Sequence, residues 1–296
     1  MLKIGVFVNP YKNLLREKLP DIIELMRKNK IEIFCPVSMT KEMGLNPVGC
    51  NVLLADEIPG KCDLIFSFGG DGTVLRTVQI VRQPQTPILA INVGGLGFLT
   101  EVLFEVFESS LELILAGKYN IEERLLLQGE IENDPNPMYV LNEFAIEKGS
   151  STRVIEIRMY IDDKYFNDYV ADGLIISTPT GSTGYSLSSG GPIVVPTSEC
   201  VILNPICPHS LTNRPVIIPS NSKLTAKMYT DHPRIIISAD NQDVREVPSR
   251  TTIRIQRAPF NARLVKYLDS DYFSLLRNKL GWGEDFRNKL RWSYSR

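Results

Sequence analysis

In the first hundred residues, short apolar runs rich in β-branched residues alternate with segments whose apolar residues recur at helical spacing. Ile4–Val8, Leu64–Phe68 and Ile88–Asn92 are runs of the first kind, and residues 15 to 26 form a segment of the second kind. Strands that alternate with helices build βαβ units, in which the strands pair in parallel. The sequence therefore predicts a Rossmann-like α/β domain with a parallel sheet at the amino-terminal end of the chain.

Beyond Gly117 the pattern changes to short strand-like runs separated by turn residues, which is typical of a β-rich domain. Near the end, an apolar run at Ala262–Leu268 and an amphipathic segment at Tyr272–Leu280 predict a strand and a helix that pack back on the first domain. We therefore expect an α/β domain at residues 1–117, a β-rich domain at residues 118–260, and a carboxyl-terminal strand and helix at residues 261–296.

Composition excludes several classes of function. With 43% hydrophobic residues and no apolar stretch near the roughly 18 residues of a membrane span, we expect a soluble protein without membrane contact. Lys and Arg total 33 against 34 Asp and Glu, so no overall basic field attracts nucleic acid. The five cysteines form no Cys-x-x-Cys pair and the first residues lack a signal peptide pattern, which together predict a cytoplasmic location and no zinc site.

Gly69-Gly70-Asp71-Gly72-Thr73 follows the strand predicted at Leu64–Phe68. Glycine after a strand lets backbone N–H groups approach an anion, as in phosphate-binding turns. An acidic residue in such a loop repels phosphate unless a cation intervenes or the carboxylate serves the chemistry. Asp71 beside a Mg²⁺-bound nucleotide and an acceptor hydroxyl resolves that conflict, although Asp-Gly is also a common dipeptide of simple turns.

A second cluster, Thr178–Gly191, interleaves hydroxyl side chains with glycines after the strand predicted at Gly173–Ser177. Such residues are poor core material and suit a polar ligand, which favours a binding site over a surface loop. Leu141-Asn142-Glu143-Phe144 places a polar pair within the strand predicted at Met138–Glu147, and taken alone it indicates exposure at a sheet edge.

Other nucleotide and hydrolase motifs are missing from the sequence. No Gly-x-x-x-x-Gly-Lys-Ser/Thr run, no Gly-x-Gly-x-x-Gly after a strand and no His-Arg-Asp loop occurs, so P-loop, dinucleotide-fold and protein kinase interpretations lack their motifs. Gly181-Ser182-Thr183-Gly184 is not a nucleophile elbow either, which argues against serine hydrolase chemistry.

Taken in order, these motifs resemble those of the NAD kinase family. The resemblance runs from about residue 66 to residue 242 and includes Asn92–Glu101 and the segment Pro208–Pro215. The Gly-Gly-Asp-Gly loop alone is shared with diacylglycerol, sphingosine and phosphofructokinases, whereas the Thr178–Tyr185 run is far more specific. The resemblance implies ATP-dependent phosphorylation of the 2′-hydroxyl of the adenosine ribose of NAD, giving NADP, with Mg²⁺ or another divalent cation accompanying ATP.

The resemblance also implies roles for individual residues. Asp71 matches the catalytic carboxylate, and Gly70, Gly72 and Thr73 match the turn that binds the triphosphate of ATP. The positions implied for NAD binding are Asp71, Gly72, Phe98, Asn142, Glu143, Asp172, Thr183, Tyr185, Ser188, His209 and Leu211. Of these, His209 and Leu211 match positions that approach the nucleotide from a second subunit, so a homodimer or homotetramer is expected. No protein ligand for the metal is assigned.

Two positions depart from the family's usual pattern. Asp240-Asn241-Gln242 stands where Asp-Gly-Gln is common, and Gly184 stands where alanine is commoner. Asn tolerates positive φ less well than Gly, so the first departure could alter a turn. Two competing interpretations remain: a lipid or sugar kinase, which leaves the Thr178–Tyr185 run unexplained, and a non-catalytic NAD(P) sensor, which an intact Asp71 disfavours.

Overall fold

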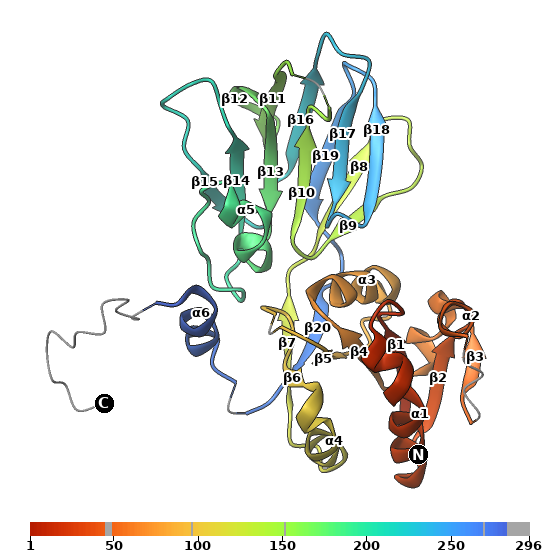
Figure 1. Ribbon diagram of the computed structural model, residues 1–296. Helices are drawn as coiled ribbons and strands as arrows, with labels where there is room; N and C mark the ends of the chain where they lie inside the picture. Colours follow the sequence, from red (N-terminus) through yellow and green to blue (C-terminus); the bar gives the residue numbers. More distant parts are fainter. Residues whose placement is uncertain (45–48, 96, 151, 269, 283–296) are drawn as a thin grey trace, which may run out of the picture.

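The computed structural model describes residues 1–44, 49–95, 97–150, 152–268 and 270–282. Its amino-terminal part is a mostly parallel sheet with strand order β3-β2-β1-β4-β5-β20-β7, and β6 pairs with β5 (Figure 1). The strands are β1 (Lys3–Val8), β2 (Glu32–Pro36), β3 (Asn51–Leu53), β4 (Leu64–Gly69), β5 (Ile88–Asn92), β6 (Val102–Leu103), β7 (Asn120–Arg124) and β20 (Ala262–Lys266). We call this sheet A.

Helices cover both faces of sheet A. On one face, Ile4 and Val6 of β1 join a buried cluster with the apolar residues of α1 (Asn13–Lys28), α2 (Val37–Met43) and α4 (Phe107–Leu115). On the other face, Phe7 joins a second cluster with Val74, Val78 and Val81 of α3 (Asp71–Val81). Alternate residues of β1 thus face opposite layers, which is the pleat expected of a strand buried on both sides.

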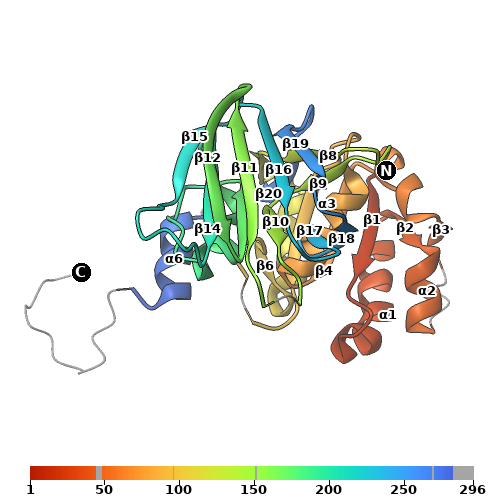
Figure 2. The same cartoon turned by 90° about the horizontal axis from the view of Figure 1, so that it is seen from above.

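The carboxyl-terminal part consists of two antiparallel sheets, with strand orders β15-β14-β13-β10-β17-β18 and β12-β11-β16-β19-β8-β9. One buried cluster draws its residues from both sheets, so the two sheets pack face to face (Figure 2). The strands are β8 (Leu127–Ile131), β9 (Met138–Val140), β10 (Glu143–Glu147), β11 (Ile155–Ile161), β12 (Lys164–Ala171), β13 (Gly173–Ser177), β14 (Cys200–Ile206), β15 (Val216–Pro219), β16 (Leu224–Tyr229), β17 (Ile235–Ala239), β18 (Asp243–Val247) and β19 (Thr252–Arg257).

The predicted fold class is confirmed, including the return of the chain to its first part. After β19, β20 enters sheet A between β5, which it pairs with in parallel, and β7, which it pairs with antiparallel. Helix α6 (Tyr272–Leu280) follows, capped by Asp271, whose carboxylate accepts from the N–H groups of Phe273 and Ser274. The residue limits given above for the domains stay predictions.

Local structure differs from the sequence pattern at two places. Residues 35–60 carry scattered Pro and Gly with little periodicity, which predicts a long connection, but α2, β3 and the short 3₁₀ helices η1 (Ala55–Glu57) and η2 (Pro59–Lys61) begin there. The helical spacing of apolar residues at 102–116 predicts one helix, but β6 and the 3₁₀ helix η3 (Phe104–Val106) precede α4. Elements of two or three residues carry too little periodicity to be recognised in a sequence. Among the described residues, no helix has the length and apolar character needed to cross a membrane.

Candidate active site

Asp71 lies at the point where β4 becomes α3, at the carboxyl end of the parallel strands. Gly69 ends β4 opposite Asn92 of β5, Gly70 stays extended, and the Thr73 N–H donates to the Gly70 carbonyl at 2.9 Å to begin the helix. The first N–H groups of a helix have no partner within it, so this turn presents donors and the positive end of a helix dipole. The strand, turn and helix predicted around the Gly-Gly-Asp-Gly loop are therefore present.

The Asp71 carboxylate is held by the segment that follows β5, where Gly94, Gly95 and Gly97 form a second glycine cluster within the motif Asn92–Glu101. It accepts hydrogen bonds from the backbone N–H groups of Phe98 at 2.8 Å and Leu99 at 3.1 Å. A side chain on Gly97 would bring its Cβ to 1.8 Å from Asp71 Oδ1, so only glycine leaves room for the carboxylate. The two glycine clusters predicted separately thus form one unit, and Phe98 is tied to Asp71 through the backbone.

A polar cavity of about 260 Å³ lies beside this turn. Gly70, Gly72 and Thr73 line it, as predicted, and so do four polar residues that the sequence interpretation missed: Asn9, Lys12, Arg76 and Gln242. Lys12 and Arg76 bring two cations to the amino-terminal end of α3, which suits a polyphosphate. A signal was available, because Asn9 follows β1 and carboxyl ends of neighbouring parallel strands meet at one sheet edge.

Asn142 and Glu143 lie where the chain leaves one antiparallel sheet for the other. The segment predicted as one strand, Met138–Glu147, is divided into β9 and β10, which belong to different sheets. The interpretation of this pair as an exposed sheet edge is wrong, because β10 lies between β13 and β17 and Glu143 is only 9% exposed. A crossover between packed sheets brings polar backbone and side chains into a buried place, where each needs a partner.

Asp240 supplies those partners. Its carboxylate, 3% exposed, accepts from the N–H groups of Leu141 at 2.7 Å, Asn142 at 2.8 Å and Glu143 at 3.0 Å. Asp240 and Asn241 both have positive φ, 51° and 53°, in a tight turn that the Gln242 N–H closes onto the Ala239 carbonyl at 2.9 Å. Asn241 therefore occupies the position of the family's glycine without loss of the turn, since Asn is among the residues that reach this region.

The Thr178–Gly191 run divides into supporting and exposed residues. The side chains of Thr178, Thr180, Ser182 and Ser186 are buried, and Thr178 Oγ1 donates to the Leu141 carbonyl at 2.5 Å. Thr180 Oγ1 accepts from Arg124 and Ser186 Oγ from Asn204, so these buried hydroxyls bond to other groups of the protein. Thr183 and Gly184 are partly exposed, and Tyr185 and Ser188 are exposed.

Gly184 and Tyr185 connect this run to the Asn142-Glu143 pair. A Cβ on Gly184 would lie 3.0 Å from Glu143 Oε2 and 3.5 Å from Asn142 Nδ2, so the three residues are neighbours. The family's commoner alanine would press on Glu143, and glycine removes that contact. Burial first, and then hydrogen bonding to Glu147, raise the pKa of Tyr185 to about 12, and its hydroxyl donates to Glu147 Oε1 at 2.9 Å.

The remaining predicted residues lie farther along this surface. Asp172, between β12 and β13, is paired with Lys148 at 2.6 Å, and its charge acts on Tyr185. His209 and Leu211 are exposed in the connection between β14 and β15, and the Leu211 side chain is 89% exposed. Among the described residues, no group of three His, Cys, Asp or Glu side chains could hold a metal ion.

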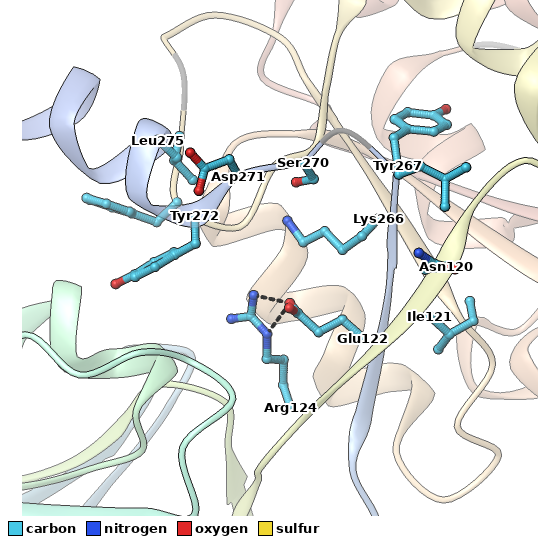
Figure 3. Close-up of a pocket in the computed structure, with 12 residues that line it drawn as sticks. Asn120, Ile121, Glu122, Arg124, Lys266, Tyr267, Ser270, Asp271, Tyr272 and Leu275 are labelled. Atoms are coloured by element: carbon cyan, nitrogen blue, oxygen red, sulfur yellow. Dashed lines mark hydrogen bonds and ion pairs between the residues drawn. The ribbon is translucent and has the colours of Figure 1, made fainter.

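A larger cavity of about 370 Å³, lined in part by Phe98, lies between sheet A and α6 (Figure 3). Its two inward cations are already neutralised by neighbouring acids: Arg124 pairs with Glu122, and Lys266 pairs with Glu101 at 2.6 Å. Arg124 also donates to Thr180 Oγ1 at 3.2 Å, which ties β7 to the hydroxyl-rich run. Arg124 therefore joins the two parts of the chain, and the described cations that line this cavity are already paired with acids.

Comparison with known proteins matches both parts of the chain. The model of the ATP-NAD kinase N-terminal domain matches residues 4–119, and that of the C-terminal domain matches residues 141–267. The NAD kinase of Geobacter metallireducens is 36% identical over 287 residues, 96% of this chain and 100% of that protein. The NAD kinase of Geotalea daltonii is 42% identical over 232 residues, 77% of this chain and 82% of that protein.

Two solved structures are also similar. The yeast NADH kinase complexed with NADH has a TM-score of 0.87 over 98% of this chain and 90% of its own, and at 24% identity it supports the fold alone. The NAD kinase from Archaeoglobus fulgidus in complex with ATP has a TM-score of 0.75 at 26% identity, covering 95% of this chain and 99% of its own. These findings confirm the predicted activity, and the chain, an NAD kinase enzyme, belongs to the ATP-NAD kinase family.

Proposed function

We propose that this enzyme binds the triphosphate of ATP at the turn Gly70–Thr73 and NAD at the surface that Asn142, Glu143 and Tyr185 share, with the Asp71 carboxylate between the two. The observation that supports this arrangement best is the fixing of Asp71 by the Phe98 and Leu99 N–H groups beside a cationic cavity. A carboxylate oxygen has further lone pairs, so Asp71 can still accept a proton from the attacking ribose hydroxyl.

On the ATP side, Lys12 and Arg76 neutralise phosphate charge, and the N–H group of Gly72, in the first turn of α3, donates to a phosphate oxygen. We propose that a divalent cation, Mg²⁺, enters with ATP and is held chiefly by the phosphates, because the turn offers one carboxylate and Mg²⁺ commonly uses one or two together with substrate phosphates. The cation supplies charge neutralisation on the transferred group. The protein aligns donor and acceptor and removes the proton.

On the NAD side, we propose that Phe98, Asn142, Glu143, Thr183 and Tyr185 surround the dinucleotide, with Asp172 and Ser188 as further contacts. The nearness of Gly184 to both Glu143 and Asn142 supports a single surface for these residues. Tyr185 is anchored by its hydroxyl at Glu147 while 38% of the residue remains exposed, which suits an aromatic face that packs on a base or ribose.

Incubation of the chain with ATP, Mg²⁺ and NAD is expected to yield NADP, detected by a dehydrogenase that accepts only the phosphorylated cofactor. The hydroxyl-rich surface and the Asn142-Glu143 pair suit a polar dinucleotide, so diacylglycerol and fructose 6-phosphate should give no product. Chelation of the divalent cation should stop the reaction. Robust phosphorylation of the lipid or the hexose with none of NAD would overturn the proposed acceptor site.

We propose that the chain forms a homodimer or homotetramer in which His209 and Leu211 reach the site of a neighbouring subunit. Large apolar side chains are exposed in this part of the chain: Leu211 in the connection between β14 and β15 (89%), Ile217 of the edge strand β15 (51%) and Tyr165 of β12, an edge strand of the other sheet (59%). An apolar surface of this kind commonly marks a protein interface. Light scattering at assay concentration is expected to give two or four chains per particle. An active monomer would remove the roles of His209 and Leu211.

A further inference from the structure

Glu143 is a buried acid with little to stabilise a negative charge. Its side chain is 9% exposed, and the oxygen Oε2, which faces position 184, has no hydrogen-bond partner among the described residues. Only the Tyr185 backbone N–H lies close enough to favour its ionised form. A buried carboxylate without donors is costly, so this group keeps its proton instead.

Asp240, which accepts a hydrogen bond from the Glu143 N–H, is surrounded by donors where Glu143 is not. Three backbone N–H groups, those of Leu141, Asn142 and Glu143, donate to its carboxylate, and the Gln79 side chain adds a fourth donor. Hydrogen bonds to an ionised carboxylate stabilise the charged form. The negative charges of two interacting acids repel each other, so one of the two keeps its proton. Asp240 has more hydrogen-bond donors, so it carries the charge and Glu143 keeps the proton.

In the part of the chain that the structure describes, no cation acts on Glu143 to reverse this order. Ser177 of β13 lies opposite it in the sheet, Asp240 follows β17, and the phenol of Tyr185 is directed to Glu147. Burial first, and the Asp240 charge second, raise the pKa of Glu143 to about 8. Burial raises the pKa of Asp240 to about 6 against the effect of its donors, so at neutral pH Asp240 is ionised and Glu143 is neutral.

We infer that Asp240 is a positioning residue for the NAD site: it holds the backbone of residues 141–143 and keeps Glu143 as a neutral carboxylic acid, which donates a hydrogen bond to NAD. The inference rests on the proposed function, in which Glu143 contacts NAD. Gln79 supports the same arrangement. Its side chain donates to the Tyr139 carbonyl as well as to Asp240, and it belongs to α3, the helix that begins at Asp71. Helix α3 therefore begins at Asp71 and, through Gln79, contacts Asp240 and the segment that leads to Glu143.

The test is the NAD dissociation constant of the full chain, measured by calorimetry from about pH 6.5 to about pH 9.5, a range that brackets the pKa of Glu143. In the wild type, NAD binding is expected to be constant at low pH and to weaken as Glu143 ionises near pH 8. Asp240→Asn removes the nearby charge, so the weakening should begin about one pH unit lower. Asp243→Asn is the matched control, since Asp243 lies in the same hairpin, 41% exposed, paired with Arg245 at 2.9 Å.

A second variant keeps the test decisive where Asp240→Asn disturbs folding. Glu143→Gln retains an uncharged donor, so it should bind NAD within a few-fold of the wild type at pH 7 and lose the weakening near pH 8. A flat wild-type curve, or an Asp240→Asn curve that is weaker at every pH without a shift, would overturn the inference alone. Unchanged NAD affinity in Glu143→Ala would instead contradict the NAD site itself, on which the proposed function depends.

Discussion

Asp71→Asn is expected to lower kcat by at least about 10²-fold, because general-base assistance commonly contributes about 10² to 10⁴-fold. Asn keeps the size of the side chain and removes the charge that accepts the proton of the ribose hydroxyl. Steady-state rates at saturating ATP and NAD measure the effect. The KM values should change far less than kcat, since the turn Gly70–Thr73 and the Asn142-Glu143 surface remain.

The structure also bounds the cost of Asp71→Asn to folding. The carboxylate accepts from two N–H groups, those of Phe98 and Leu99, and an amide has one oxygen for them. Losing one such bond costs about 1 to 3 kcal/mol, which a melting curve detects without predicting unfolding. Asp162→Asn is a matched control, because that carboxylate also accepts a backbone bond, from Lys223 at 2.9 Å, in the distant β11–β12 hairpin. Folded Asp71→Asn protein with a rate within a few-fold of the wild type would remove the proposed base.

Much of the first part of the fold was predictable because its signals are local. Leu64–Phe68 is apolar except for Ser67 and is followed by glycine, and a fully buried parallel strand leaves that pattern. The position of Asp71 at the end of this strand then follows from the chain itself. The return of residues 262–266 to sheet A was predictable from an apolar run, but its place between β5 and β7 was not, because strand order depends on contacts that no local pattern contains.

The surroundings of Glu143 were beyond local reasoning. The polar pair Asn142-Glu143 within an apolar run predicts an edge strand, whereas in the structure it lies where the chain passes from one antiparallel sheet to the other. Asp240, which satisfies that crossover, lies 97 residues from Glu143 along the chain. A long-range partner of this kind is visible only once β10 and β17 are paired. The sequence pattern shows that Asn142 and Glu143 are polar residues within an apolar run, but it does not show the hydrogen bonds from their N–H groups to Asp240 that stabilise them there.

The hydroxyl-rich run shows a different limit. Thr178, Ser182 and Ser186 look like ligand contacts in a sequence, but their side chains bond to backbone or to buried neighbours. Hydroxyls serve both purposes equally well, and composition does not separate them. Lys12 and Arg76 show the opposite limit. Each is a single cation that forms no motif in the sequence, and only the sheet edge and helix α3 bring the two to one cavity.

Gly97→Ala should reduce kcat about as strongly as removal of the Asp71 charge, although it leaves every proposed catalytic group in the sequence. The added Cβ would lie 1.8 Å from Oδ1 and 2.5 Å from Cγ of Asp71, distances that no pair of atoms tolerates. The side chain is the movable partner, so Asp71 must swing away and give up its bonds to Phe98 and Leu99. Displacement of a reacting group by about 1 Å can cost about 10²-fold in rate.

Gly95→Ala supplies the control within the same loop. Neither glycine has positive φ, and a Cβ on Gly95 meets nothing within 4 Å, so this variant should keep wild-type rates and stability. The comparison separates position from charge: Asp71→Asn keeps the side chain in place without its charge, and Gly97→Ala keeps the charge in the wrong place. If both slow the reaction while Gly95→Ala does not, Asp71 acts through a charge held at one point. Full activity of a folded Gly97→Ala enzyme would show that the contact between the two glycine clusters has no part in the chemistry.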